Sequence, residues 1–371
     1  MGRYKYVALA TVATIVSILL WFDPLPSLAT QPAVLLQTQP SLSQVIPDGE
    51  PVRIALTAVD LRKYPLSNVR FQLQLTTPAK TPWFTSDFPI VEGTTLLELI
   101  ADAPSGKLEF AQVMPIRGSY VLKARVTPLV AGAFEPFEQS LQLSVPERFV
   151  KYRNAAFLIG ILMLAGIVSG WIIGGDQAVR EGEVASQPIR LVLSFFTMLA
   201  IAVLLFVNIS AELNSAHSHG EMQPTPSASE QPSQDLELRL SGDQLTSVGQ
   251  LATQTVQVIN KKTGVPKAGV VVKARSIALE DGKQMFAYQG RTDDQGRLSW
   301  KEQFFDGSPH RVIVEAEQSI GPVLRASHEV AVEGIEPPLY IRLISLSYYT
   351  GAFVLSLLAG IWMHRRFPRT I

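Results

Sequence analysis

The sequence has no cysteine and little charge. Without cysteine, disulfide bonds, thiolate zinc sites, iron–sulfur clusters and a cysteine nucleophile are excluded, although small extracytoplasmic domains often depend on disulfides. Charged residues make up 17% of the chain, against about 25% in typical soluble proteins. The 32 basic residues balance the 32 acidic residues, so no overall charge favours nucleic acid or an acidic substrate. Any partner must therefore be recognised by local features.

Common catalytic signatures are missing from the sequence as well. It contains neither the Walker A pattern, nor the G-x-S-x-G pattern of hydrolases, nor the H-E-x-x-H pattern of zinc proteases. The five histidines are scattered over a linker, a predicted β domain and the C-terminal tail. We therefore expect that the protein is not an enzyme.

Long apolar stretches without charge are what the sequence does contain. Residues 155–175 and 343–363 are each close to the ~20 residues that cross a bilayer core. Residues 191–208 form a slightly shorter stretch, which we also expect to span. Ion and proton paths usually place charged residues inside the membrane. These spans contain none, so they do not predict a pump or a secondary transporter.

The N-terminal region, residues 1–29, has two interpretations. Its apolar run, residues 7–22, follows Arg3 and Lys5 and precedes Ser27-Leu28-Ala29, which is typical of a cleaved secretory signal. The alternative is a retained signal anchor. The chain therefore has three to four transmembrane helices, and in both cases residues 30 onward emerge outside the cytoplasm.

Basic residues predict the orientation of the spans. The loop 176–190 and the tail 364–371 carry arginines, which favour the cytoplasmic side of a membrane. Only the flank around Lys151 disagrees, because its basic residues would lie outside. We expect an integral protein of a bacterial inner membrane, either plasma or thylakoid, with its β domains on the periplasmic or lumenal side and its C-terminus in the cytoplasm.

Between the spans, apolar and polar residues alternate with period two, which predicts β-strands. We expect two all-β, Ig-like antiparallel sandwich domains, residues 52–148 and residues 235–334. Each follows a Pro-rich linker, residues 30–51 or residues 209–234, and each leads into a span.

The two predicted β domains also resemble each other. Residues 58–75 and 258–275 share a strand, a basic loop, a proline and a second strand, and residues 118–126 echo residues 309–317. Convergence can produce such a match, because proline hairpins are common in sandwiches. The shared order of four elements favours a tandem duplication of helix, linker, sandwich and helix.

The turn Thr292-Asp293-Asp294-Gln295-Gly296-Arg297 follows a proline hairpin and an apolar strand. With these features, residues 264–317 resemble carboxypeptidase regulatory-like and related prealbumin-like sandwich domains. This resemblance implies a fold rather than an activity. Asp293 and Asp294 are expected to serve the turn rather than acid–base chemistry.

One linker segment has metal-ligand chemistry. His217 and His219 project to the same side of an extended chain, so they could bind Cu²⁺, Ni²⁺ or Zn²⁺ with Glu221 or Met222. The alternative is a solvated linker, which the adjacent Pro-Thr-Pro-Ser composition favours. The architecture is also similar to that of accessory subunits in nickel, cobalt and copper transport. No other cofactor is expected, and His310 and His328 receive no role.

Glycines mark one face of the span at 155–175. Gly166, Gly170 and Gly174 recur every four residues, so they form a smooth stripe that permits close approach of another helix. Glycine is common in spans in any case. The partner is either another span of this chain or a different protein, and the last span offers Ser347 and Gly351.

These observations predict a non-enzymatic, membrane-anchored binding or assembly subunit that presents two extracytoplasmic Ig-like domains to a membrane complex. The expected partners are the membrane, other membrane-protein subunits and an extracytoplasmic protein, and no nucleic acid. The alternative prediction is an accessory protein for capture and transport of nickel, cobalt or copper.

Overall fold

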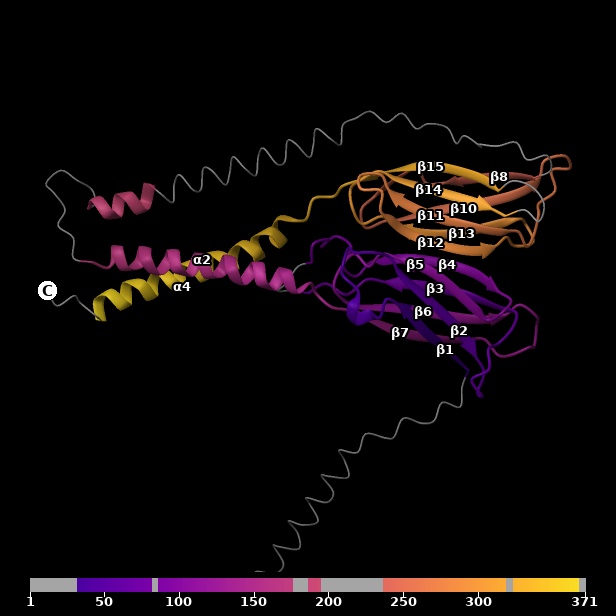
Figure 1. Ribbon diagram of the computed structural model, residues 1–371, viewed down its shortest axis with the longest axis horizontal. Helices are drawn as coiled ribbons and strands as arrows, with labels where there is room; N and C mark the ends of the chain where they lie inside the picture. The colour runs from indigo at the N-terminus through magenta and orange to yellow at the C-terminus, as the bar shows by residue number, and fades with distance from the viewer. Residues whose placement is uncertain (1–31, 82–85, 176–185, 195–235, 318–322, 367–371) are drawn as a thin grey trace, which may run out of the picture.

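The computed structural model describes residues 32–81, 86–175, 186–194, 236–317 and 323–366. In Figure 1 two β-sandwiches lie one above the other, and two long helices leave them at the same end. The helices are α2 (Phe149–Ile173) and α4 (Leu339–Arg366). Both are long and apolar enough to cross a membrane, by length and composition. The predicted span 7–22 lies outside the described residues, and only residues 191–194 of the predicted span 191–208 are described, as helix.

The first sandwich contains seven strands and a short 3-10 helix. They are β1 (Ala33–Gln39), η1 (Leu42–Gln44), β2 (Val52–Val59), β3 (Val69–Thr76), β4 (Thr95–Ala103), β5 (Lys107–Gln112), β6 (Gly118–Pro128) and β7 (Phe137–Val145). The second sandwich contains eight strands. They are β8 (Leu236–Gly242), β9 (Leu245–Ser247), β10 (Leu251–Asn260), β11 (Val271–Ala278), β12 (Gln284–Arg291), β13 (Arg297–Gln303), β14 (His310–Ala316) and β15 (Leu324–Glu333).

Both sandwiches have the same Ig-like layer order. In the first, β1-β2-β5 faces β7-β6-β3-β4, and in the second, β8-β10-β13 faces β15-β14-β11-β12. Along each strand, buried apolar residues alternate with exposed ones, as in the pattern of β3. The predicted β-sandwich architecture is therefore confirmed. The second half also contains β9, which pairs in parallel with β15.

The two sandwiches are joined edge to edge through both layers. β5 pairs with β12 and β4 pairs with β13, so that one eight-stranded and one seven-stranded sheet cross the whole molecule. These pairings cover strand edges that would otherwise expose unpaired backbone groups. The buried apolar side chains form one continuous cluster across both halves. The two sandwiches predicted from the sequence thus form one double sandwich with a shared core.

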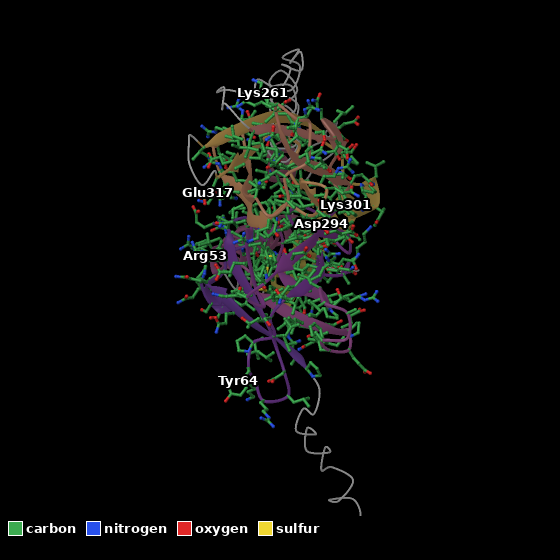
Figure 2. All side chains as sticks on the ribbon, turned by 90° about the vertical axis from the view of Figure 1, so that its right-hand side faces the viewer. Arg53, Tyr64, Lys261, Asp294, Lys301 and Glu317 are labelled. Atoms are coloured by element: carbon green, nitrogen blue, oxygen red, sulfur yellow. The ribbon has the colours of Figure 1, made fainter. Side chains whose placement is uncertain are left out.

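The halves are related by an approximate two-fold axis. The first half supplies β5 to one junction and β4 to the other, and the second half supplies β12 and β13 in the equivalent roles. Figure 2 looks along the long axis, and the equivalent loops at Tyr64 and Lys261 lie at opposite ends of the double sandwich. Arg53 and Glu317 mark the flank of the eight-stranded sheet, and Lys301 marks the opposite flank.

Local geometry repeats between the halves. After β2, Asp60 Oδ1 accepts hydrogen bonds from two backbone amides, and after β10, Asn260 Oδ1 does the same. Each of these turns closes with an isolated bridge to a proline, Val59 to Pro65 and Ile259 to Pro266. Such side-chain turns need Asp or Asn at the first position, which explains why both halves keep that residue type.

One sequence-based boundary was wrong. Residues 30–51, predicted as a Pro-rich linker, contain β1 and η1, and β1 pairs along its whole length with β2. Pro40 and Pro47 lie after β1 and therefore do not interrupt its hydrogen bonds. The alternation in β1 is weak because it is an edge strand, in which Leu35 is 45% exposed.

Candidate functional site

The predicted helix-packing glycines of α2 lie against α4. A Cβ added at Gly166 would clash with the Ser356 hydroxyl, and one added at Gly170 would clash with the carbonyl oxygen of Leu357. At Gly174 a Cβ would lie 3.1 Å from the Cα of Ile361. The partner of the glycine stripe is therefore α4 of this chain, and only glycine permits this backbone approach.

The complementary face of α4 differs from the predicted one. Gly351 has open space around it in the described part of the chain, whereas a Cβ at Gly360 would clash with the carbonyl oxygen of Ile167. The small residues of α4 in the contact are Ser356 and Gly360 rather than Ser347 and Gly351. The spacing of four residues between Ser356 and Gly360 was visible in the sequence and was missed.

The basic flank around the start of α2 is partly neutralised. Lys151 forms an ion pair with Asp87 and lies 3.8 Å from Glu147, and Glu147 also pairs with Arg117 at 3.0 Å. Acidic neighbours contribute little to the charge bias that orients spans, so the disagreement between this flank and the predicted orientation remains.

The predicted metal ligands His217, His219, Glu221 and Met222 lie outside the described residues. Within residues 32–81, 86–175, 186–194, 236–317 and 323–366, no three His, Asp or Glu side chains gather to hold a metal ion. Asp293 accepts hydrogen bonds from the amides of Gln295 and Arg297 at 2.9 and 2.8 Å. It therefore serves the turn, as the sequence predicted.

Two buried side chains occupy equivalent positions at the start of β6 and β14. The Tyr120 hydroxyl donates to the Ile116 carbonyl at 2.6 Å and accepts from the Ile116 amide at 2.9 Å, in the manner of the tyrosine corner of Ig-like domains. In the second half, His310 bonds through Nδ1 to the Ser308 carbonyl at 2.8 Å. Burial lowers the pKa of His310 and of His328 and so favours the neutral form of both side chains, although Asp306 acts in the opposite direction on His310.

The outward residues of the two junctions form two equivalent rows. In the eight-stranded sheet, strand register aligns a row that we call the arginine row: Arg53, Ala111, Ala287 and Arg275. In the seven-stranded sheet, the corresponding register aligns what we call the ion-pair row: Thr253, Lys301, Glu98 and Gln74. The two central residues of each row face each other across the junction.

The ion-pair row is closed by its own side chains. Lys301 Nζ lies 3.0 Å from Glu98 Oε2, and Gln74 donates to Glu98 Oε1 at 3.4 Å. In the arginine row the two central alanines leave a hollow, because they have no side chain beyond Cβ. This hollow belongs to a groove of about 350 Å³ that Arg53, Arg275, Ala111 and Ala287 help to line.

Each junction has one polar residue at an inward position, and these two residues are equivalent. Gln112 lies opposite Phe286, and Glu302 lies opposite Leu97 at the equivalent position. Glu302 is fully buried, and its carboxyl group accepts hydrogen bonds from Ser276 Oγ at 2.7 Å and from Trp300 Nε1 at 3.1 Å. Burial raises the pKa of Glu302 to about 7 despite these hydrogen bonds. The sequence pattern did not single out this carboxyl group, because it occupies an inward position of a strand.

No family model matches the sequence, and no curated protein matches it. Similar solved structures include the CARDB domain of a Pyrococcus furiosus protein, with 17% identity over 26% of this chain and 87% of that chain and a TM-score of 0.20. The adhesin InvE of Yersinia pseudotuberculosis has 12% identity over 82% of this chain and 60% of that chain, with a TM-score of 0.22. Salmonella alpha-2-macroglobulin has 11% identity over 82% of this chain and 15% of that chain, with a TM-score of 0.24. Likeness at this level assigns neither a family nor a function.

Proposed function

We propose that this chain is a non-enzymatic, membrane-anchored binding or assembly subunit that holds a double β-sandwich on the non-cytoplasmic side of a membrane. The observation that carries this proposal is the contact between α2 and α4. Each helix follows the last strand of one half after a short connection, and the two meet through backbone at Gly170 and Gly360. The two helices thus pack against each other, as do the two sandwiches to which they are connected.

The exposed surfaces support this proposal. The outer side of α2 carries large apolar side chains such as Phe157, Ile161 and Leu164, each more than 60% exposed, which suits a lipid environment. Tyr152 and Tyr340 are exposed near the helix starts, where aromatic residues commonly anchor spans at the interface. Because α4 covers the glycine stripe, a partner would meet the double sandwich or the outer helix faces.

We also infer that the chain arose by tandem duplication. The repeated strand order, the Asx turns at Asp60 and Asn260, and the exchange of equivalent strands at the junctions support this origin. A duplicated unit that pairs with itself reproduces the geometry of a two-fold dimer within one chain. The metal-accessory alternative has no supporting observation among the described residues.

Thiol labelling tests the membrane topology, because the native chain has no cysteine. Val130→Cys and Lys261→Cys lie in exposed loops far from the helices, one in each half, and Arg366→Cys lies at the far end of α4. In spheroplasts or right-side-out vesicles, an impermeant maleimide should label the first two sites. It should label the third only after permeabilisation. Labelling of the two loops from opposite sides would overturn the proposed topology.

Purification in mild detergent tests the assembly role. The tagged full chain should elute in a complex larger than the 40.7 kDa monomer, with the same partner after crosslinking in intact membranes. Gly170→Leu should separate α2 from α4 and so release a partner that is held by the outer faces of the packed helix pair, whereas Gly160→Leu, with open space around Gly160, should leave the two helices packed. A lone monomer in several detergents and in lipid nanodiscs would argue against the proposal.

A further inference from the structure

We infer that the groove over the arginine row binds the carboxylate of an acidic peptide segment. This proposal rests on the binding role proposed above and names the chemistry of one contact. It does not depend on which side of the membrane the groove faces. The groove lies on the outer surface of the eight-stranded sheet, where the two halves meet.

Cationic groups that are available to a ligand are the first observation. The guanidinium of Arg53 is exposed and makes no ion pair with any described residue. Arg275 uses one terminal nitrogen to bind Glu315 at 3.0 Å, while its Nε is buried and has no hydrogen-bond partner in the described part of the chain. A buried donor without a partner costs free energy, and a ligand oxygen would satisfy it.

Neutralised carboxylates are the second observation. Two glutamates also line the groove, but each already has a cationic partner: Glu109 pairs with Lys107, and Glu315 pairs with Arg275 and Arg325. Lys273, another lining residue, pairs with Glu317. Arg53 therefore remains without an ion-pair partner among the described residues, and Arg275 and Arg325 share the single carboxylate of Glu315, so the groove keeps an excess of positive charge. Arginine binds carboxylates in a planar, often bidentate geometry.

The floor between the two arginines is the third observation. Ala111 and Ala287 lie directly opposite each other across the junction. Arg53 and Arg275 flank them one strand further out, so their Cα atoms are about 14 Å apart at the usual spacing of strands. Two extended arginine side chains can converge on one anion over this small apolar floor.

The volume of the groove favours a peptide over a free ion. At about 350 Å³ it is much larger than the roughly 30 Å³ share of one water molecule, and it is similar to the smaller ligand pockets of proteins. A side-chain carboxylate with its apolar stem and adjacent backbone fills such a space. The alanines accept the stem, and Gln289 at the groove can hydrogen-bond a peptide group.

The two-fold relation provides an internal control. The equivalent row in the other sheet has Thr253 and Gln74 where the arginine row has Arg53 and Arg275. Its central positions are filled by the ion pair of Lys301 and Glu98. The same backbone therefore carries an open cationic groove on one flank and a closed neutral surface on the other.

The experiment uses the full chain in nanodiscs, with binding of short fluorescent peptides followed by anisotropy. The probes are a peptide with one central glutamate between apolar residues, the same peptide with glutamine, and inorganic phosphate as competitor. We expect the glutamate peptide to bind at least about tenfold more tightly than the glutamine peptide. Arg53→Gln and Arg275→Gln should each weaken it by about tenfold.

A closing variant tests the geometry without removing the arginines. Ala111→Lys combined with Ala287→Glu reproduces the ion pair of the other row and should abolish peptide binding while leaving the thermal midpoint within a few degrees. Lys301→Ala with Glu98→Ala is the matched control on the opposite sheet and should leave binding unchanged.

Several outcomes would overturn the inference. These are equal affinity for the glutamate and glutamine peptides, full displacement by phosphate at the concentration of the peptide, or binding that survives the closing variant. If peptide binding fails while the crosslinked complex persists, only the groove is wrong. If the peptide binds and no complex is found, only the assembly role is wrong.

Discussion

The two rows at the junctions differ in chemistry although they occupy equivalent positions. In the arginine row, two alanines separate Arg53 from Arg275, whereas in the ion-pair row Lys301 and Glu98 fill the centre. The pairing of the strands depends on backbone hydrogen bonds and on the inward residues. The outward residues are therefore free to diverge between halves. A symmetric scaffold can in this way carry one closed flank and one flank suited to binding.

The largest expected effect on stability concerns the packing of α2 against α4, the helices that follow the two halves. Gly170→Leu would force the side chain against the carbonyl oxygen of Leu357, so we expect a loss of about 3 kcal/mol and separation of α2 from α4. Gly160→Leu adds the same side chain in open space and should cost much less. Denaturation in detergent measures both variants. Equal costs would mean that the glycine stripe does not hold the helices together.

The pH dependence of stability should distinguish Glu302 from Gln112, the polar inward residue at the equivalent position of the other junction. The pKa of Glu302 is raised from 4.5 to about 7, so the folded protein holds this proton more tightly than the unfolded chain. The resulting stability is complete below pH 4.5 and is lost as the pH rises through about 7, with a total near 3 kcal/mol. Glu302→Gln makes this position identical to Gln112 and should remove that part of the pH dependence.

Denaturant unfolding at about pH 4 and about pH 8 measures this difference. Relative to the native chain, Glu302→Gln should gain stability at the higher pH. Because the Ser276 hydroxyl can donate or accept, the substituted amide can keep a hydrogen bond to it. A constant difference between variant and native chain at both pH values would contradict the buried, protonated state of Glu302.

Removal of the Tyr120 hydroxyl should have a smaller effect on stability. Tyr120→Phe leaves the Ile116 amide and carbonyl without the partner they now share, so we expect a loss of about 2 kcal/mol. Tyr64→Phe removes the same hydroxyl from a side chain that is 67% exposed and should change stability little. Thermal unfolding of the two variants side by side checks this. Equal midpoints would contradict the claim that the hydrogen bonds of the Tyr120 hydroxyl stabilise the fold.

The smallest effect is expected at the ion-pair row. Lys301 and Glu98 are both partly exposed, so a double-mutant cycle should give a coupling energy of about 0.5 kcal/mol that decreases at high salt. A coupling several times larger would mean that this pair, rather than the strand pairing, holds that junction together.

The sequence predicted the strands that bury one face in the core. β2, β3 and β6 alternate strictly because one side of each is covered by the opposite sheet. β1 was missed because an edge strand exposes both of its sides more evenly. Its flanking prolines then resembled a linker. Local pattern thus succeeded where burial is one-sided and failed where it is not.

The junctions could not be predicted from the sequence. Inward residues such as Phe110 and Trp300 are buried whether a strand lies at an edge or in the middle of a sheet, so their pattern does not reveal the neighbouring strand. The glycine stripe on α2 was recognisable, but spacing alone does not identify its partner. The groove depends on residues from strands far apart in the sequence, which only the register brings together.

A disulfide between the halves tests the shared sheet most directly, because the chain has no cysteine of its own. Ala111→Cys with Ala287→Cys places two thiols on directly opposite residues of β5 and β12, within the range of Cα separations that a disulfide spans. In oxidised intact membranes we predict that this pair closes nearly completely. The control Ala111→Cys with Lys301→Cys, on opposite sheets, should stay open. An open first pair, or equal closure of both pairs, would contradict the account that one double sandwich shares both sheets.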